Sequence, residues 1–289
     1  MKKSARKTVV RLSLPLLLLM LSLSAAVVLA QPAPKPAAPP NPVPGPRVTE
    51  TLMDSSIADD PGVDKMLAAY SPKVRELDVV LGKLTGELKR GSIGSGSLGN
   101  FVADGMRTQA SLKLGKPIDL AVMNGGGLRR NAIGEGELRA RDIFELLPFE
   151  NALVTLELNG EQVMRLLGVV VSSREAQSGT LITYRVKADK SSELKSAKLL
   201  GEKCHEKEID PKATYTVVTI DYLINVGGAR YAVLREGKNA RPLGITVRDA
   251  MIAYVKSETA AGRDIKPNLD GRFVLDKANS VLTGEAPPQ

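Results

Sequence analysis

Eight prolines fall within residues 31–46, and they confine the folded part of this 289-residue chain to the residues after them. Proline fixes φ and has no amide hydrogen to donate, so such a dense run favours an extended, polyproline-like spacer without a core. We therefore expect a spacer over residues 31–47, a domain over residues 48–280 and a flexible tail over residues 281–289. The domain is long enough to bury a sizeable core.

A cationic and then apolar segment precedes the spacer. Positive charges up to Arg11 are followed by an apolar run over residues 12–30, which ends in Val28-Leu29-Ala30 with small side chains where a signal peptidase needs them. The pattern predicts a signal peptide over residues 1–30 and export to the periplasm or the extracellular space. An uncleaved membrane anchor is the alternative, because the run approaches the length of a spanning helix.

The net charge of +8 belongs to the same N-terminal region. Seven of the 40 Lys and Arg residues, and no Asp or Glu, lie in residues 1–47, which leaves 33 basic and 32 acidic residues after them. A domain this close to neutral lacks the basic surface that nucleic-acid-binding proteins present, so we expect no nucleic-acid partner.

The chain contains one histidine, His205, and one cysteine, Cys204. That count excludes a zinc site built from several His or Cys ligands, an intrachain disulfide and a His-rich two-metal phosphatase site. Adjacent side chains diverge on a strand and on a helix, so a surface position explains this pair better than a nucleophile with its base.

Apolar periodicity in the domain alternates between helix and strand. Helical spacing follows the Asp60-Pro61 cap and recurs over residues 98–106, 140–147, 161–171 and 247–255. Strand-like runs cover residues 79–84, 118–123, 152–158, 181–186, 215–220 and 271–275. Asn159-Gly160 and the region 181–220 indicate antiparallel pairing, and the Gly/Ser-rich residues 91–99 indicate a flexible loop. We predict an α+β domain with a mixed sheet flanked by helices.

Residues 94–99 match the G-x-G-x-x-G pattern of dinucleotide-binding folds, with Asp119 twenty residues beyond Gly99. In that fold the glycines follow a strand at once and the acid ends the next strand, and neither holds here. A Gly/Ser-rich loop matches such a pattern by chance, so we expect no cofactor in this chain.

A stronger signal follows the strand predicted over residues 118–123. Asn124 comes first, then Gly125, Gly126 and Gly127, and Arg129 follows one residue later. Glycines let a ligand approach the backbone, Asn both donates and accepts, and Arg offers a planar fork to phosphate or carboxylate. Strand ends are common ligand sites in α/β architectures. A ligand-binding loop and a plain tight turn both remain open on this chemistry alone.

Two aromatic residues stand in expected loops. Phe149 follows the helix-ending Pro148, and Tyr231 comes soon after Gly227-Gly228. Taken singly, a core phenylalanine and a partly buried tyrosine explain them. Together they could sandwich a flat ring, at about 1–3 kcal/mol for each stacking contact.

These motifs together resemble a known family. The segments N-G-G-G-L-R at 124–129, L-P-F at 147–149 and G-G-A-R-Y at 227–231 resemble, in order and spacing, the C-terminal domain of bacterial and animal 5'-nucleotidases. The segment S-L-G-N-F-V-A-D-G-M at 97–106 resembles a helix of that domain, and residues 215–219 and 270–272 fit its later strands. The resemblance covers roughly residues 55–276 and implies an α+β fold that recognises nucleotides.

The resemblance also implies roles for individual residues. Phe149 and Tyr231 would stack on either side of the base, Asn124 would hydrogen-bond the base, and Arg129 would contact the phosphate-bearing end. Gly125, Gly126, Gly127, Gly227 and Gly228 would form the two loops. Arg90, Arg230 and Glu236 are further candidates, the last as an acceptor for a ribose hydroxyl.

The chain departs from the family pattern at three places. The family normally carries a preceding metallophosphatase domain with D-x-H and G-N-H-E motifs, whereas here the spacer leads directly into the C-terminal domain. The family's arginine upstream of L-G-N is replaced by the glycine/serine run, with Arg90 nearest. The usual G-G-D-G-[FY] is G-G-A-R-Y, which replaces an aspartate by Ala229 and a glycine by Arg230.

The leading hypothesis is an exported nucleotide- or nucleoside-binding domain that selects substrates for phosphate-ester hydrolysis. A separate metallophosphatase chain would hold the divalent metals, and the membrane would be a partner only if the N-terminal segment is uncleaved. One alternative is an envelope-associated interaction module without a ligand. The other is a self-sufficient nucleotide hydrolase, which would need a metal site made of carboxylates, Asn and His205.

Overall fold

The structure is a computed structural model that describes residues 50, 52–201 and 205–280. The chain divides into two units, residues 1–58 and 59–289. The expected signal peptide, the proline-rich spacer, Cys204 and residues 281–289 lie outside the described residues. Among the helices that are described, none has the length and apolar character needed to cross a membrane.

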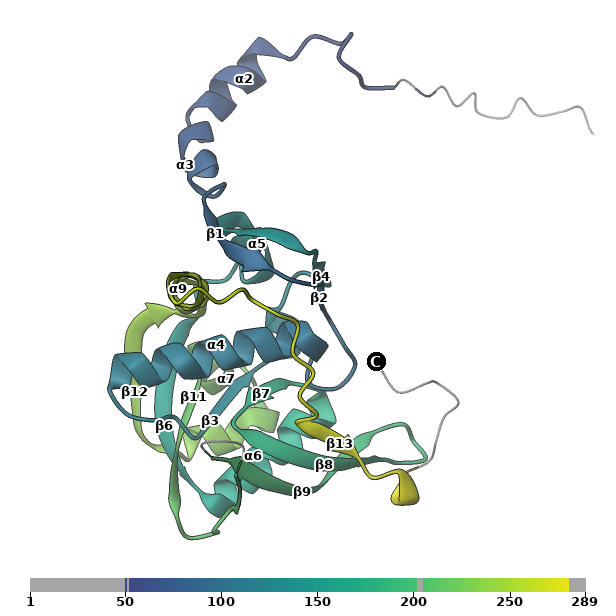
Figure 1. Cartoon of the computed structure of the whole chain (residues 1–289), viewed down its shortest axis with the longest axis vertical. Coiled ribbons are helices and arrows are strands. Elements are labelled where there is room, and N and C mark those ends of the chain that lie inside the picture. The colour runs from purple at the N-terminus through teal and green to yellow at the C-terminus, as the bar shows by residue number, and fades with distance from the viewer. Residues whose placement is uncertain (1–49, 51, 202–204, 281–289) are drawn as a thin grey trace, which may run out of the picture. The chain divides into compact units, whose positions relative to one another are not determined.

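Two mixed sheets form the framework of the second unit (Figure 1). The larger contains, in spatial order, β12 (Lys238–Thr246), β6 (Ala152–Asn159), β11 (Thr214–Ile220), β3 (Leu120–Met123) and β7 (Ala176–Ser178). The smaller contains β10 (Glu206–Glu208), β9 (Ser192–Leu200), β8 (Thr180–Val186) and β13 (Phe273–Leu275). Two antiparallel pairs join β1 (Val80–Leu84) to β5 (Gly136–Arg139) and β2 (Leu88–Lys89) to β4 (Ala132–Ile133).

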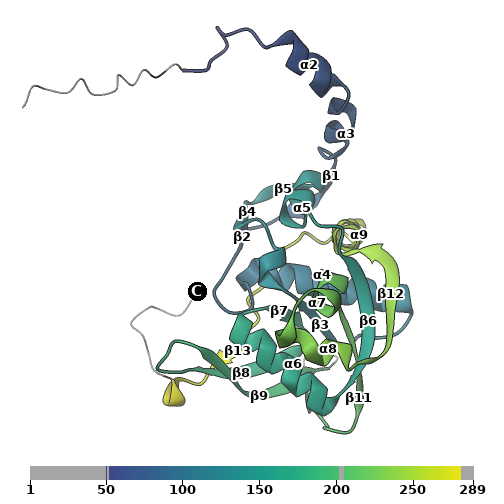
Figure 2. The ribbon, with the colours of Figure 1, turned by 180° about the vertical axis from the view of Figure 1, so that it is seen from behind.

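Helices cover both faces of the larger sheet, which confirms the expected α+β architecture. On the face shown in Figure 1, α4 (Gly96–Leu114) packs on β3 and β7 with α9 (Val247–Ala260) beside it. On the face shown in Figure 2, α6 (Gly160–Ser173) packs on β6 and β11 and also contacts β9. The shorter helices are α2 (Pro61–Ala68), α3 (Ser71–Glu76), α5 (Ala140–Leu146), α7 (Asp221–Asn225) and α8 (Ala232–Arg235).

A capping box at Asn159 and Gln162 starts helix α6 directly after β6. The Oδ1 atom of Asn159 accepts from the amide of Gln162 at 2.8 Å, and Oε1 of Gln162 accepts from the amide of Asn159 at 2.9 Å. This reciprocal pair begins a helix, so β6 runs straight into α6 and the expected antiparallel turn at Asn159-Gly160 is wrong. The antiparallel partners of β6 are β11 and β12. Antiparallel pairing within 181–220 is confirmed by β8 with β9 and by β9 with β10.

The Gly/Ser-rich segment is tightly folded where a flexible loop was expected. Helix α4 already begins at Gly96, so residues 96–99 are helical. Gly96 has φ +64°, and a Cβ atom there would lie 2.3 Å from the amide nitrogen of Gly91 and 2.6 Å from the carbonyl oxygen of Lys89. Only glycine fits this approach. The close fit holds residues 90–95 against the start of α4.

Strand direction brings distant residues to one edge of the larger sheet. Strands β3 and β11 are parallel, so both end at this edge, and β7 is antiparallel to β3 and begins there. Asn124 therefore follows β3, Tyr222 comes soon after β11, and Glu175 immediately precedes β7 at the same edge. Crevices outside strand ends are where sheets of this kind place ligands.

Candidate functional site

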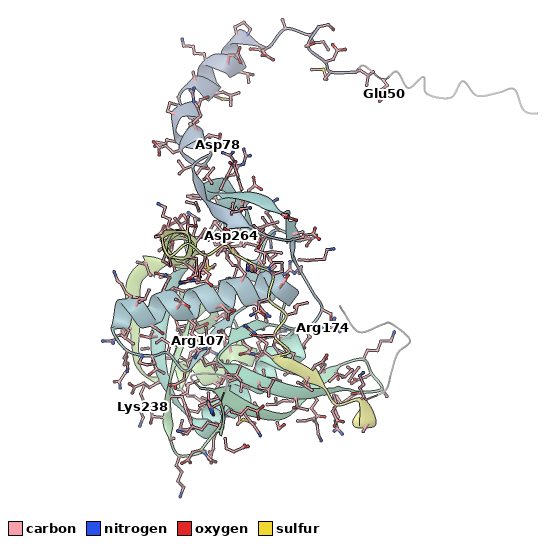
Figure 3. All side chains as sticks on the ribbon, viewed as in Figure 1. Glu50, Asp78, Arg107, Arg174, Lys238 and Asp264 are labelled. Carbon is pink, nitrogen blue, oxygen red and sulfur yellow. The ribbon has the colours of Figure 1, made fainter. Side chains whose placement is uncertain are left out.

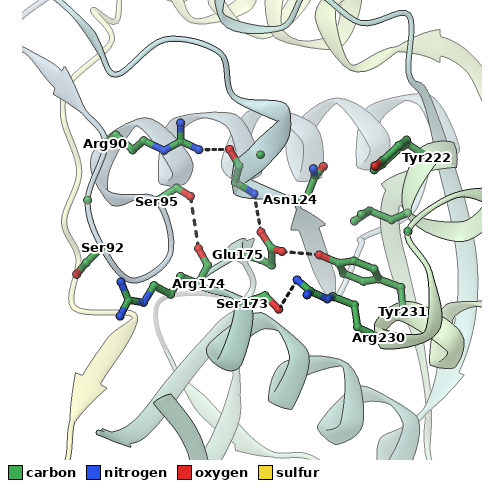
Figure 4. Close-up of a pocket in the computed structure, with 15 residues that line it drawn as sticks. Arg90, Ser92, Ser95, Asn124, Ser173, Arg174, Glu175, Tyr222, Arg230 and Tyr231 are labelled. Carbon is green, nitrogen blue, oxygen red and sulfur yellow. Dashed lines mark hydrogen bonds between the residues drawn. The ribbon is translucent and has the colours of Figure 1, made fainter. Parts of the chain in front are cut away.

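A cavity of about 540 Å³ opens at this edge of the sheet (Figure 4). Its volume lies in the range of small-molecule sites. Four segments line it: the loop before α4, the turn after β3, the end of α6 with the residue before β7, and the residues that follow β11. The lining residues are Arg90, Gly91, Ser92, Ser95, Asn124, Gly125, Gly126, Ser173, Arg174, Glu175, Tyr222, Leu223, Gly227, Arg230 and Tyr231.

The two ends of the pocket differ in chemistry. Figure 4 shows Arg90, Ser92 and Arg174 at one end and Tyr222, Tyr231 and Arg230 at the other. An end with two arginines and an end with two tyrosine rings suit a ligand that joins an anionic group to a flat ring.

The glycine turn after β3 is held from both sides. Residues Gly125–Gly127 form a short 3₁₀ turn in which the Gly127 amide donates to the carbonyl of Asn124 at 3.0 Å. The Gly125 amide donates to Oε2 of Glu175 at 2.5 Å. Arg90 donates to the carbonyl of Leu128 at 3.1 Å and to that of Gly125. The amides of Gly125 and Gly127 are thus already used within the protein, and Arg90 braces the turn.

Asn124 supplies a polar atom without a partner. Its Oδ1 atom is buried and makes no hydrogen bond to any residue that the structure describes. Buried polar atoms in folded proteins are nearly always hydrogen-bonded, because an unpaired one costs about 1–3 kcal/mol. A donor on a bound ligand would satisfy this oxygen.

The buried carboxylate of Glu175 holds the side chain of Tyr231 at the edge of the pocket. Glu175 is 5% exposed and Tyr231 is 4% exposed, and the Tyr231 hydroxyl donates to Oε1 of Glu175. Burial raises the pKa of Glu175 above its ordinary value, although the hydrogen bonds from Tyr231 and Gly125 oppose the shift. Burial and the hydrogen bond to Glu175 raise the pKa of Tyr231 as well. The ring therefore has a fixed orientation in the pocket wall.

Replacing Tyr231 by phenylalanine should lower the free energy of unfolding by about 1–3 kcal/mol at neutral pH, because a buried carboxylate loses a donor. The pKa of Glu175 would rise further. A group whose pKa is raised by folding loses stabilising effect as pH rises through that pKa, so the deficit should grow from acid to neutral pH. Urea unfolding at several pH values measures the difference in the free energy of unfolding between the variant and the wild type. Tyr222→Phe, at a 43% exposed ring, is the matched control, and equal stability of the two variants would contradict this role of Tyr231.

The structure brings part of the expected site together. Seven expected residues line the pocket: Asn124, Gly125, Gly126, Gly227, Tyr231, Arg90 and Arg230. Gly127, Arg129, Phe149, Gly228 and Glu236 are not among the lining residues. The Arg129 guanidinium instead lies over the ring of Phe149, 5.7 Å from its centroid, and that ring is 47% exposed. Glu236 forms an ion pair with Arg165 of α6.

Several lining residues were not predicted from the sequence. Glu175, Arg174 and Ser173 precede a three-residue strand that has no recognisable pattern. Tyr222 carried a signal, because it comes soon after an apolar strand that was expected, and a strand's end is a common ligand site. Ser92 and Ser95 belong to the glycine/serine segment, for which only a flexible loop was expected.

The described residues offer no cluster of three or more His, Cys, Asp or Glu side chains that could hold a metal ion. In the pocket itself, Glu175 is the one acid among the lining residues, and both its oxygens already accept hydrogen bonds from Gly125 and Tyr231. The residues of the pocket therefore fit an organic ligand better than a metal centre.

Comparison with known proteins agrees with this geometry. A sequence model of the family described as 5'-nucleotidase, C-terminal domain, matches residues 77–236. The match covers more than half of the chain, and the chain belongs to this family.

Similar proteins extend beyond the region that they share with this chain. The endonuclease YhcR of Bacillus subtilis is 29% identical over 235 residues, which cover 78% of this chain and 18% of that protein. Protein UshA of Yersinia enterocolitica is 29% identical over 234 residues, 79% of this chain and 38% of that protein. The structure of a 5'-nucleotidase precursor from Thermus thermophilus superposes with a TM-score of 0.63 at 25% identity, over 74% of this chain and 42% of that one. The chain thus spans less than half the length of each.

Proposed function

We propose that this chain binds a nucleotide or nucleoside in the pocket beside Asn124. The observation that carries the proposal is the buried Oδ1 atom of Asn124, which has no partner among the described residues. Asn124 lines a pocket that also contains two tyrosines, Tyr222 and Tyr231, and three arginines. A nucleobase amino group would satisfy the amide oxygen, the tyrosine end would contact the base, and the arginine end suits phosphate.

The relatives support the same class of ligand. One is described as a trifunctional nucleotide phosphoesterase, and the Thermus thermophilus structure is that of a 5'-nucleotidase precursor. We infer that this chain selects the substrate for phosphate-ester hydrolysis while a separate metallophosphatase supplies the metals. The longer relatives support such a pairing, because each contains residues beyond the matched part.

Calorimetry with the full chain and with adenosine, AMP and a UDP-sugar tests the binding step. We expect a Kd between roughly micromolar and millimolar for at least one of them, since ordering costs reduce the gross contact energy. Asn124→Ala should weaken that binding about five- to tenfold, through the loss of one hydrogen bond. Asn131→Ala is the control, at an exposed side chain outside the pocket lining. Absence of binding by the wild type would refute the proposal and favour an interaction module.

The aromatic sandwich is tested by a different variant. Phe149 is not among the residues that line the pocket, so stacking on both faces of a base requires the Phe149 side chain to move over the ligand. If it does, Phe149→Ala weakens binding by about 1–3 kcal/mol. Unchanged affinity in this variant would refute the sandwich and leave the pocket itself in place.

We also propose export, from the cationic and apolar residues 1–30. The periplasm or the extracellular space would then be where the pocket meets its ligand. Fractionation of cells, with N-terminal sequencing of the mature chain, would distinguish a cleaved signal from a retained anchor. A cytoplasmic chain with an intact N-terminus would refute export.

A further inference from the structure

The helices α2 and α3 carry an apolar stripe that lies open to solvent in the described part of the chain. No residue of either helix is buried. Apolar side chains nevertheless recur along them every three or four residues, which places them on one helical face. They are Val63, Met66, Leu67, Tyr70 and Val74, and each is between 47% and 63% exposed. Figure 3 shows the two helices with their side chains, just before the labelled Asp78.

Helices as short as these need packing to persist in water. The helix α2 has eight residues and α3 has six, whereas isolated helices shorter than about 12–15 residues are marginal. Oδ1 of Asp60 caps α2, because it accepts from the amides of Gly62 and Val63 at 2.7 and 3.1 Å. A cap fixes where a helix begins but buries no apolar face. Contiguous exposed apolar surface of this kind marks an interaction site.

The two ends of the stripe carry opposite charge. Residues 59–65 hold three acids and one base, and residues 73–76 hold two bases and one acid. Asp64 lies in the first turn of α2 and Arg75 in the last turn of α3. They are 11 positions apart in the sequence, which is about three helical turns, so both flank the stripe on the same side. A helical surface with one acidic and one basic end is complementary to a reversed copy of itself.

We propose that α2 and α3 form a self-association surface on which a second copy of this chain packs in the antiparallel direction. A two-fold axis relates the copies, so the same stripe serves both partners. Val63 packs beside Val74 of the second copy, and Leu67 meets the second copy in the middle of the stripe. The acidic end of each copy then faces the basic end of the other. The inference is independent of the proposed nucleotide binding.

A second copy suits this surface better than a lipid bilayer does. Helices that lie on membranes are rich in Lys and Arg on their polar face, whereas acids outnumber bases four to three over residues 59–76. The contact is nevertheless small, since a standard interface has about 20–30 residues a side. We therefore expect a reversible dimer with a dissociation constant of roughly 10–500 μM rather than a permanent one.

Sedimentation equilibrium of the full chain over about 5–500 μM tests the surface. Wild type should shift from monomer to dimer as concentration rises. Leu67→Lys should raise the dissociation constant at least about tenfold, because it places a charge in the middle of an apolar contact. Leu112→Lys on α4 is the matched control, at a leucine that is 66% exposed, and should leave association unchanged. Neither leucine is buried, so the melting temperature of the dissociated chain should stay the same in both variants.

A charge exchange tests the antiparallel direction. Asp64→Arg and Arg75→Asp should each weaken the dimer by roughly two- to tenfold at low salt, because each sets like charges against each other. The double variant should restore the wild-type dissociation constant, since both partners of the pair are exchanged. A double variant that associates more weakly than either single variant would refute the antiparallel arrangement.

Three results would overturn the self-association surface. The first is wild type that stays monomeric over the whole concentration range. The second is association that Leu67→Lys leaves unchanged, because another part of the chain, such as the apolar residues 12–30, would then cause it. The third is a monomer that binds phosphatidylcholine–phosphatidylglycerol vesicles through Leu67, which would assign the stripe to a membrane.

Discussion

Replacing Arg272 by methionine is expected to lower the free energy of unfolding by about 1.5–3 kcal/mol, because the half-buried carboxylates of Asp104 and Asp270 lose a charged hydrogen-bond partner. Arg272 is 6% exposed. Its two Nη atoms donate to both oxygens of Asp104 at 2.9 Å, and Nε and Nη2 donate to Asp270 at 2.8 and 2.7 Å. Nη1 also donates to the carbonyl of Gln177 in β7 at 2.9 Å. The substitution therefore disconnects α4, β7 and the segment before β13.

Arg263→Met is the control for Arg272→Met. Arg263 also donates through Nε and Nη2 to both oxygens of one carboxylate, Glu258, at 2.8 and 2.7 Å, but its side chain is 60% exposed. Exposed pairs contribute about 0–1 kcal/mol. Thermal unfolding should therefore show a fall of roughly 3–12 °C for Arg272→Met and little change for Arg263→Met. Equal shifts would contradict the buried network.

The hydrogen bonds between Arg272 and Asp270 should also make the stability of the protein depend on pH. Burial raises the pKa of Asp270, but the hydrogen bonds and charge of Arg272 outweigh burial and leave that pKa lowered. A carboxyl group with a lowered folded pKa stabilises the protein above its unfolded pKa, and the effect is lost as pH falls through the folded pKa. The wild type should lose this contribution below about pH 4, and Arg272→Met should lack it.

The sequence predicted those strands and helices whose apolar residues recur at regular spacing. It did not predict elements whose conformation depends on pairing with a neighbouring strand. The buried β3 lies within the strand expected over residues 118–123, and α4 contains the helix expected over residues 98–106 but runs from Gly96 to Leu114. The strand β12 was not expected, because most of its residues are exposed, it contains Pro242, and its pairing with β6 is interrupted by register shifts. Such an edge strand owes its conformation to β6 rather than to its own sequence.

The candidate site divides in the same way. Asn124 and its glycines could be predicted, because their chemistry is contiguous and follows a recognisable strand. Glu175 and Arg174 could not, because their place in the same pocket as Asn124 depends on β7 pairing with β3 in the antiparallel direction. The hydroxyl bond from Tyr231 to Glu175 joins residues 56 positions apart. No spacing in the sequence marks that contact.

The full chain alone should release no phosphate from AMP when Mg²⁺, Mn²⁺, Co²⁺ or Zn²⁺ is added. Metal-assisted hydrolysis needs several oxygen or nitrogen ligands that converge on an open cation site. Carboxylates are plentiful in the sequence, but among the described residues no three or more Asp, Glu, His or Cys side chains lie close enough together to hold a metal ion. Where Asp104 and Asp270 do converge, the guanidinium of Arg272 takes the place that a cation would need.

A colorimetric phosphate assay with and without a chelator measures this directly. Enzymes commonly accelerate such reactions by more than about a millionfold, so true activity would be unmistakable. Metal-stimulated release that the chelator removes and that His205→Ala or Asn124→Ala reduces would show a self-sufficient hydrolase. Release that persists unchanged in Asn124→Ala would indicate a contaminating phosphatase. With no release above the buffer blank and AMP binding intact, this chain recognises the nucleotide without hydrolysing it, as the proposed pairing with a separate metallophosphatase requires.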